Sequence, residues 1–198
     1  MNSGRSSVMV GILVVLCVVL GYWWIPTNAK EATSQSGVPA ATVANYVHSV
    51  IEANRTFYTI HVVERLQAKG VVTASENWRV TNTLPLPAQF LRESADLATK
   101  TGSKIDYRLI SLWPINKQNG PADPFEREGL NDVLAQQERA YTGTITRGGE
   151  RYFRAIYADR AVSQACIGCH NVHPNSPKKD FKANDVMGGI VISIPMGQ

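Results

Sequence analysis

The sequence predicts an α+β domain: an antiparallel sheet with helices packed on one side, a long N-terminal helix, and one transmembrane helix ahead of it. Helical patterns and a single β-rich run fill residues 42–140, whereas β-rich runs bounded by turn residues dominate the remainder. Strands gathered in this way, apart from most of the helices, are typical of α+β folds. The length of 198 residues suits one domain with its own core.

An apolar segment at residues 8–25, VMVGILVVLCVVLGYWWI, contains no charged residue. As a helix it would span about 27 Å, close to the hydrocarbon thickness of a bilayer. The three aromatic residues at 22–24 suit a membrane interface, and Arg5 on the other side favours a cytoplasmic N-terminus. We therefore predict a transmembrane anchor at 8–25 behind a short cytoplasmic tail at 1–7.

A cleaved signal peptide ending at Ala29 is the alternative interpretation of this segment. Signal-peptide cores usually run about 7–15 residues, so the length favours an uncleaved anchor. In both interpretations the domain is exported. We expect a single-pass inner-membrane protein whose domain faces the periplasmic or extracytoplasmic side of a bacterium. With Cys17 in the apolar segment, Cys166 and Cys169 are left in the exported part and are expected to act together at one site.

Residues 26–41 are mostly small and polar, and we interpret them as a linker to a domain over 42–198. A helix is predicted from Thr42 to Lys69, with Gly70 closing it. One face of this helix is expected to pack and the opposite face to be solvated. The packed face comprises Val47, Ile51, Asn54, Tyr58, His61 and Arg65. The solvated face comprises His48, Glu52, Arg55 and Thr59.

The next elements have recognisable boundary signals. A helix is predicted over 84–102, with Pro87 in its first turn and Gly102 just past its end. Residues 106–114 alternate like a strand that proline stops. The following helix, within 123–140, has Asp123 as its N-cap and Glu126 placed for a capping box.

Two β-rich runs at 140–158 surround Gly148 and Gly149 and predict a hairpin. A loop is expected after the hairpin, and a last strand over 185–196. The loop contains the stretch CIGCHNVH at 166–173, in which two thiols and two imidazoles share eight positions.

The first five residues of this stretch form C-x-x-C-H, which is typical of covalent haem attachment. Two thiols at this spacing can add to the two vinyl groups of one haem, and the adjacent imidazole can bind its iron. We predict one haem c held by Cys166 and Cys169 through thioethers, with His170 as the proximal iron ligand.

Two other sites would use the same residues. A zinc site would take Cys166, Cys169, His170 and His173, but zinc ligand pairs are usually separated by a longer loop, and adjacent Cys169 and His170 would strain a tetrahedron. A redox-active dithiol would open a helix beside a βαβ unit, and the sequence predicts no such unit. Haem is favoured over both.

Several blocks of the sequence resemble the PAS-like haem c sensor family, over about residues 42–196. They are ANRTFYTIHVVERL, LPLPAQFLRE, YRLISLWPINKQNG, DPFEREGL, CIGCHNVHPNSPKKDF and NDVMGGIVISIP. Members are extracytoplasmic input domains of bacterial membrane cyclases, chemoreceptors and histidine kinases, and others stand alone. The resemblance implies a PAS-like fold, haem on Cys166, Cys169 and His170, and a signalling or redox role. Asn184 stands where the family pattern has glycine.

We expect a sensor of redox state or of a small ligand that acts through a signalling partner, since no output module follows in the chain. A periplasmic electron carrier that exchanges electrons with a cytochrome is the alternative, and a zinc-binding or structural module is a lesser one. No Ser/His/Asp arrangement, phosphate loop or carboxylate pair stands out, so no enzyme is expected. The net charge of +4 without interleaved aromatic and basic residues gives no support for nucleic-acid binding.

A second axial ligand is the last prediction from the sequence. His61 falls on the predicted packed face of the long helix, whereas His48 faces away. A neutral imidazole on a packed face needs a partner, and haem iron is one such partner. A histidine hydrogen-bonded to the backbone or to a propionate is the alternative interpretation of His61.

Overall fold

The structure is a computed structural model, and it describes residues 37–197. The anchor predicted at 8–25 and Cys17 lie outside the described residues. Within residues 37–197, no helix combines the length and the apolar character that a membrane span requires.

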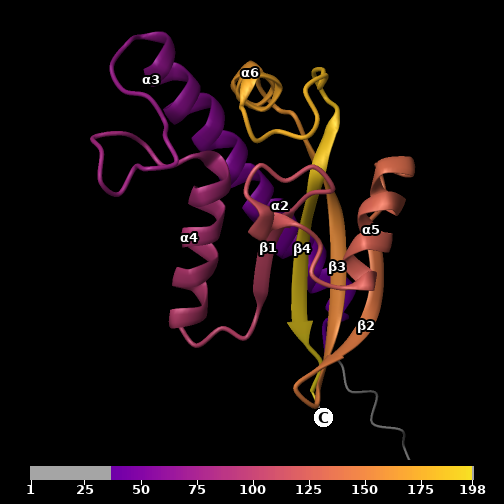
Figure 1. The fold of residues 1–198 in the computed structure, drawn as a ribbon. Coiled ribbons are helices and arrows are strands. Elements are labelled where there is room, and N and C mark those ends of the chain that lie inside the picture. Colours follow the sequence, from indigo (N-terminus) through magenta and orange to yellow (C-terminus); the bar gives the residue numbers. More distant parts are fainter. Residues whose placement is uncertain (1–36, 198) are drawn as a thin grey trace, which may run out of the picture. The chain divides into compact units, whose positions relative to one another are not determined.

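Four antiparallel strands form one sheet in the order β1-β4-β3-β2 (Figure 1). The strands are β1 (Asp106–Ile110), β2 (Tyr141–Arg147), β3 (Glu150–Arg160) and β4 (Val186–Pro195). The predicted α+β class is confirmed, and so is the order of the predicted helices and strands, to which the structure adds a helix between β3 and β4. The last strand of the chain, β4, lies between β1 and β3 and is buried along nearly all its length.

The long N-terminal helix consists of three segments that follow one another without a break, and shorter helices come after it. It comprises α2 (Ala40–Phe57), the π-helical η1 (Tyr58–Glu64) and α3 (Arg65–Ala68). The other helices are α4 (Pro87–Lys100), the 3-10 turn η2 (Lys117–Asn119), α5 (Pro124–Ala135) and α6 (Gln164–Val172). The long helix is thus confirmed, beginning two residues before the predicted Thr42.

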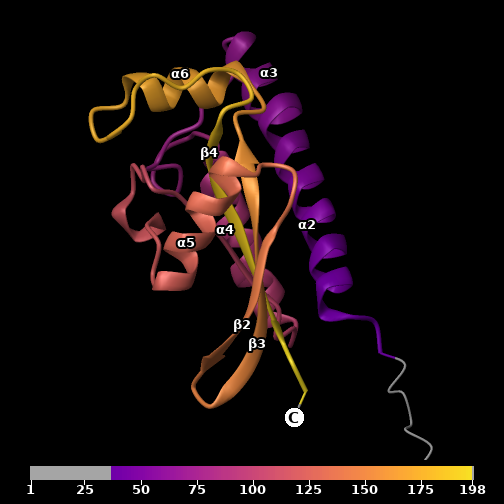
Figure 2. The same ribbon diagram turned by 90° about the vertical axis from the view of Figure 1, so that its right-hand side faces the viewer.

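Helices cover both faces of the sheet, so the expectation of helices on one side is wrong. On one face Ile190 and Ile192 of β4 pack with Ala44 of α2 and Leu91 of α4. On the other face, Val191 packs with residues of α5, and Figure 2 shows α2 and α5 on opposite sides of the strands. The cause is in β4, whose apolar run Ile190–Val191–Ile192 presents apolar side chains to both faces.

The long helix packs with residues from both of its predicted faces. Arg55 and Thr59 are 4% and 0% exposed, whereas Phe57 is 63% exposed and His61 is also exposed. His48 is half-buried, and its ring stacks on Tyr157 with 3.9 Å between centroids. The predicted orientation of the helix is therefore right for Val47 and Ile51, which pack against the core, and wrong at Arg55. Arg55 is buried because it has an acidic partner on the sheet that the helical pattern alone does not reveal.

Several boundary signals are confirmed. Gly148 and Gly149 have φ of 60° and 81°, which gives the two-residue hairpin its left-handed turn. The Asp123 carboxylate accepts a hydrogen bond from the Glu126 amide at 2.9 Å, as an N-cap does. Asn184, at the position where the resembled pattern has glycine, is the one non-glycine residue among those described with positive φ, at 67°. Asparagine tolerates this conformation better than other non-glycine residues.

Candidate functional site

The residues Cys166, Cys169 and His170 lie on helix α6, so the prediction of a loop here is wrong. The helix connects β3 to β4 at the end of the sheet where β3 stops (Figure 1). Ser163 precedes its first turn, and its carbonyl accepts a hydrogen bond from the Cys166 amide at 3.2 Å. Positions i, i+3 and i+4 of a helix share one face, so α6 presents both thiols and the imidazole together.

Both cysteines are free thiols. Cys166 is half-buried, and the hydroxyl of Ser163 lies 3.6 Å from its sulfur. Cys169 is the more exposed residue, yet desolvation of its sulfur and the negative charge of Glu76 raise the pKa of its thiol. The two sulfurs thus form no disulfide with each other in the structure.

The ring of His170 is half-buried against Phe181, edge to face, with 5.9 Å between centroids. Burial, and next the neighbouring His173, lower the pKa of His170 below its ordinary value of 6.5. Its Nδ1 is buried without a hydrogen-bond partner among the described residues. A neutral imidazole with a nitrogen lone pair is the form that binds iron.

Apolar side chains surround this face of α6. Ala161, Phe181 and Met187 form a buried cluster that Trp113, Cys166 and Ile167 extend. Trp113 meets Phe181 edge to face at 5.9 Å between centroids. Two thiols, a neutral imidazole and an apolar, aromatic wall are the groups that a covalently attached haem requires, so the residues present fit this cofactor.

A buried ion pair lies beside the site. Arg55 of α2 donates a hydrogen bond to the carboxylate of Asp159, at the end of β3, and both side chains are almost fully buried. Burial raises the pKa of Asp159 to about 6, although the attraction of Arg55 opposes this shift. This pair is not among the residues predicted from the sequence. Asp159 lies two residues after Tyr157 and four after Ala155, so it shares their inward-facing side of the strand. This strand pattern could have indicated a buried carboxylate that needs a partner.

The alternative zinc set does not converge. Nε2 of His173 lies 3.6 Å from a carboxylate oxygen of Glu76, and its Nδ1 accepts a hydrogen bond from the Asn175 amide at 3.1 Å. In the part of the chain that the structure describes, no three His, Cys, Asp or Glu side chains are grouped closely enough to hold a metal ion. The described sheet is also wholly antiparallel, so the βαβ unit expected beside a thioredoxin-like dithiol is absent from it.

His61 does not lie on a packed face as expected. It belongs to the π-helical segment η1, its side chain is exposed, and its ring contacts the equally exposed Phe57 at 4.9 Å between centroids. His61, which was predicted to lie on the packed face, is therefore on the exposed side of the long helix.

The fold and the site together define a class: a small α+β protein with a C-x-x-C-H motif on the helix that precedes its last strand. The chain belongs to the Tll0287-like family, whose model matches residues 30–195. Among solved structures it is similar to the cyanobacterial heme-protein Tll0287, with a TM-score of 0.50 and 15% sequence identity, over 81% of this chain and 99% of that chain. At this identity the likeness shows the fold alone. No curated protein matches the chain.

Proposed function

We propose that this chain is a membrane-anchored, extracytoplasmic c-type haem protein that senses redox state or a small ligand and acts through a partner. The observation that carries the proposal is the common face of α6 that bears Cys166, Cys169 and His170. Cys166 and His170 border an apolar cluster there, and Cys169 is exposed beside them. Membership of the Tll0287-like family supports it, since a solved relative of the same fold is described as a heme-protein.

Each residue has a distinct role in this proposal. Cys166 and Cys169 attach the cofactor through thioethers, and His170 supplies the proximal nitrogen. Phe181 and Trp113 exclude water from the buried side of the site. When bound, haem supplies an iron centre that can take up an electron or a small ligand. No catalytic residue is assigned, and we propose no enzymatic activity.

The sensor role rests on the fold as well as on the site. A long N-terminal helix across an antiparallel sheet supports the PAS-like resemblance of the sequence. The helix α6 follows β3 after three residues, and residues 173–185 connect it to β4, so a change at the site can reach both central strands of the sheet. A sensor should change conformation or partner affinity when the iron is reduced or binds a ligand such as carbon monoxide.

An electron carrier is the second candidate, and one observation favours it. The outer side of α6 is open to solvent, with Cys169 exposed and Val172 75% exposed, so a cofactor edge here could meet a redox partner. Hydrogen exchange measured in the reduced and oxidised states separates the two functions. Altered exchange in β3 and β4 supports the sensor. Unchanged exchange together with fast electron transfer to a cytochrome would favour the carrier.

The membrane anchor is tested separately. Extraction of bacterial membranes with carbonate should leave the full-length protein in the membrane fraction, because residues 8–25 are proposed to span it. Release of a protein that starts near Lys30 would show a cleaved signal peptide instead. This outcome would leave the haem proposal intact.

Ligation of iron by His61 also stays a prediction, although its exposed position removes the reason for which it was made. The ferric spin state decides it. If His61 binds the iron, His61→Ala should convert a low-spin spectrum to a high-spin one, whereas His173→Ala should not. A high-spin wild type, or an unchanged His61→Ala spectrum, would exclude His61.

A further inference from the structure

A second polar site lies on the sheet face that carries α5. Asp106 of β1, Ser193 of β4 and Arg154 of β3 are paired across three neighbouring strands and form one polar row. The next row on this face is mostly apolar, with Val191 opposite Ile156. Charged side chains thus interrupt a sheet face that otherwise packs against a helix.

The charges in this region are buried and connected. Glu126 of α5 is 2% exposed, and it accepts hydrogen bonds from the Arg108 guanidinium and, at 2.7 Å, from the Ala122 amide. Arg154 is 5% exposed and donates from Nε to the Ser193 hydroxyl at 3.3 Å and from Nη1 to the Asp123 carboxylate at 2.6 Å. Glu126 and Arg154 also lie within 3.6 Å of each other.

Stability alone is a weak reason for such a network. Replacing buried ion pairs by apolar residues of similar volume is often neutral or stabilising, because burying charges costs several kcal/mol per ion. A few polar groups that converge on a cavity are instead typical of ligand sites. The network is therefore a candidate site rather than a stabilising element.

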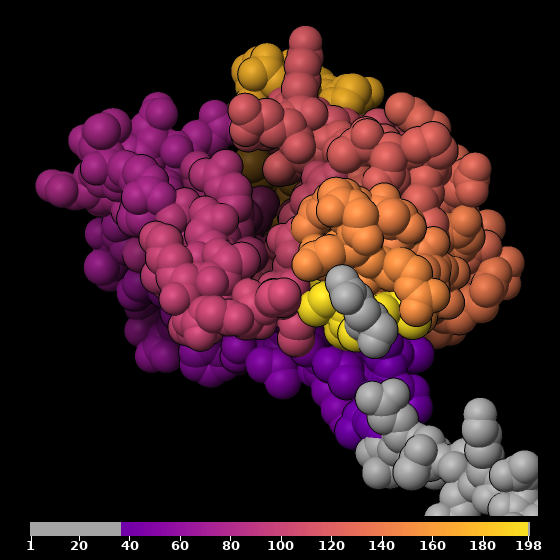
Figure 3. Space-filling model, turned by 90° about the horizontal axis from the view of Figure 1, so that it is seen from below, coloured from indigo at the N-terminus to yellow at the C-terminus, as the bar shows by residue number. Residues whose placement is uncertain are grey.

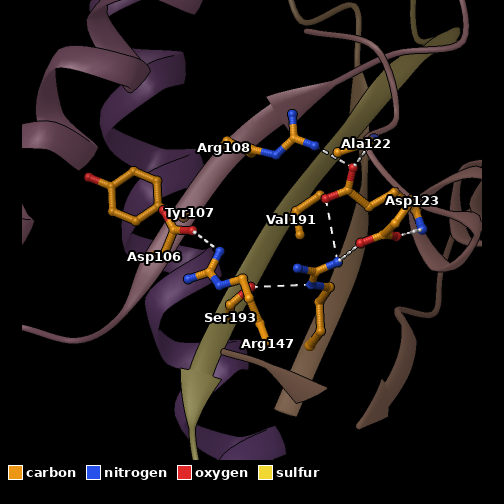
Figure 4. A pocket seen from close by; sticks show the side chains of 10 residues that line it. Asp106, Tyr107, Arg108, Ala122, Asp123, Arg147, Val191 and Ser193 are labelled. Atoms are coloured by element: carbon orange, nitrogen blue, oxygen red, sulfur yellow. Dashed lines mark hydrogen bonds and ion pairs between the residues drawn. The ribbon is translucent and has the colours of Figure 1, made fainter. Parts of the chain in front are cut away.

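A cavity of about 240 Å³ adjoins the network. Figure 4 shows Arg108, Arg147, Asp106 and Asp123 around it, from β1, from the end of β2 and from the start of α5. From the hairpin end, Figure 3 shows a hollow between the magenta part of the chain and the orange hairpin. The volume is below the roughly 300–1,000 Å³ of sites for drug-sized molecules, so the ligand is small.

Unused donors around the cavity outnumber unused acceptors. The two hydrogen bonds from Arg154 use Nε and Nη1, which leaves Nη2 available. Arg108 uses only Nη2, which leaves its Nε and Nη1. Arg147 is paired with Asp106 at 3.6 Å and lies over the ring of Tyr152, but it makes no hydrogen bond, so its N–H groups can still donate to a ligand. On the acceptor side, both oxygens of Glu126 face Arg108 or Arg154, and both oxygens of Asp123 accept hydrogen bonds. Among the acidic groups that line the cavity, this leaves only the Asp106 carboxylate without a hydrogen bond.

We infer that this cavity binds a small carboxylate ligand, held by Arg154 and Arg147. Guanidinium groups recognise carboxylates through paired, charge-assisted hydrogen bonds. The site is separate from α6, because Arg154 lies six residues before the end of β3 at Arg160, about 20 Å at the rise of a strand. The protein thus has a ligand site that does not involve Cys166, Cys169 or His170.

Equilibrium dialysis of radiolabelled propionate against the full-length protein tests this inference. Propionate should bind saturably, unlabelled propionate should displace it, and propionamide and propylammonium, which have nearly the same shape without the carboxylate, should not. Arg147→Gln should weaken binding about tenfold or more, because it removes a charged donor at an exposed position that the fold does not need. Arg151→Gln is the matched control, as Arg151 is an exposed arginine on the same hairpin that does not line the cavity, and its affinity should equal that of the wild type.

Three results would overturn the inference: no saturable binding, equal displacement by propionamide, or full affinity in Arg147→Gln. Arg154→Lys provides a second variant, since lysine keeps the charge but loses the planar donor pair. It should also weaken binding if circular dichroism shows that it folds. If it does not fold, the result for Arg147→Gln decides.

Discussion

At Arg55 and Asp159, two opposite charges are buried where the long helix crosses β3. Glu52 lies nearby, with a carboxylate oxygen 3.6 Å from the Arg55 guanidinium. A buried ion pair is costly to break by removing one partner, because the other charge is left without compensation. The pair fixes the orientation of α2 on the sheet, beside the cluster that includes Cys166.

Removing one partner of this pair should therefore destabilise the protein strongly. We expect Arg55→Met or Asp159→Leu alone to lower the free energy of unfolding by about 3–5 kcal/mol, and the double variant to recover most of the loss. Urea unfolding of the four proteins measures the coupling. Arg139→Met, in an exposed pair with Asp132, is the control and should cost under about 1 kcal/mol. Additive losses in the double variant would contradict this account.

The same pair should make stability depend on pH. The pKa of Asp159 is raised to about 6 in the folded protein, against about 3.9 for an unfolded aspartate, so the folded state binds more protons between these values. The contribution of Asp159 to stability is therefore greatest below about pH 4 and is lost as the pH rises to about 6. The wild type should lose stability relative to the double variant between pH 4.5 and pH 7. An equal difference at both pH values would show that Asp159 does not titrate in this range.

At the scale of elements, the boundaries of helices and strands could largely be predicted, whereas the orientation of the long helix could not. Pro87, Asp123 and the Gly148–Gly149 pair act locally, so the sequence alone reveals them. The buried side of α2 depends on Asp159, which lies 104 residues from Arg55 in the chain. The periodic pattern of a helix cannot predict a partner so distant in the chain.

The orientation of α2 can be tested with lysine substitutions on its two faces. Thr59→Lys should lower the free energy of unfolding by more than about 3 kcal/mol, because Thr59 is fully buried and a lysine there would have no partner. Phe57→Lys should change it by less than about 0.5 kcal/mol, because Phe57 is mostly exposed. Denaturant unfolding measures both. The reverse order would restore the orientation that the sequence predicts.

The helix α6 shows a different limit of prediction. The motif identifies its three residues by type and spacing but does not indicate the helix, since the nine residues of α6 have no regular apolar pattern. Here the turn after Ser163 and the packing of Phe181 and Ala161 decide the local structure. The residues of the site could be predicted from the motif, but the helix that carries them could not.

For the whole molecule, the two sites differ in how far a sequence can predict them. Cys166, Cys169 and His170 lie within five positions, so a short motif defines the first site. The second site combines β1, the β2–β3 hairpin, β4 and the start of α5, and only the pairing of the strands brings Arg108, Arg154 and Glu126 together. Charges that depend on strand register cannot be grouped before the sheet is known.

Covalent attachment of haem to α6 can be measured by haem staining after denaturing electrophoresis. The full-length protein, produced with the machinery that matures c-type cytochromes, should keep its stain, because thioether bonds survive denaturation. Cys166→Ala/Cys169→Ala should lose the stain, whereas Cys17→Ser, the matched control in the apolar segment, should keep it. A wild type that loses its stain on denaturation, or that is colourless and contains zinc, would contradict the account.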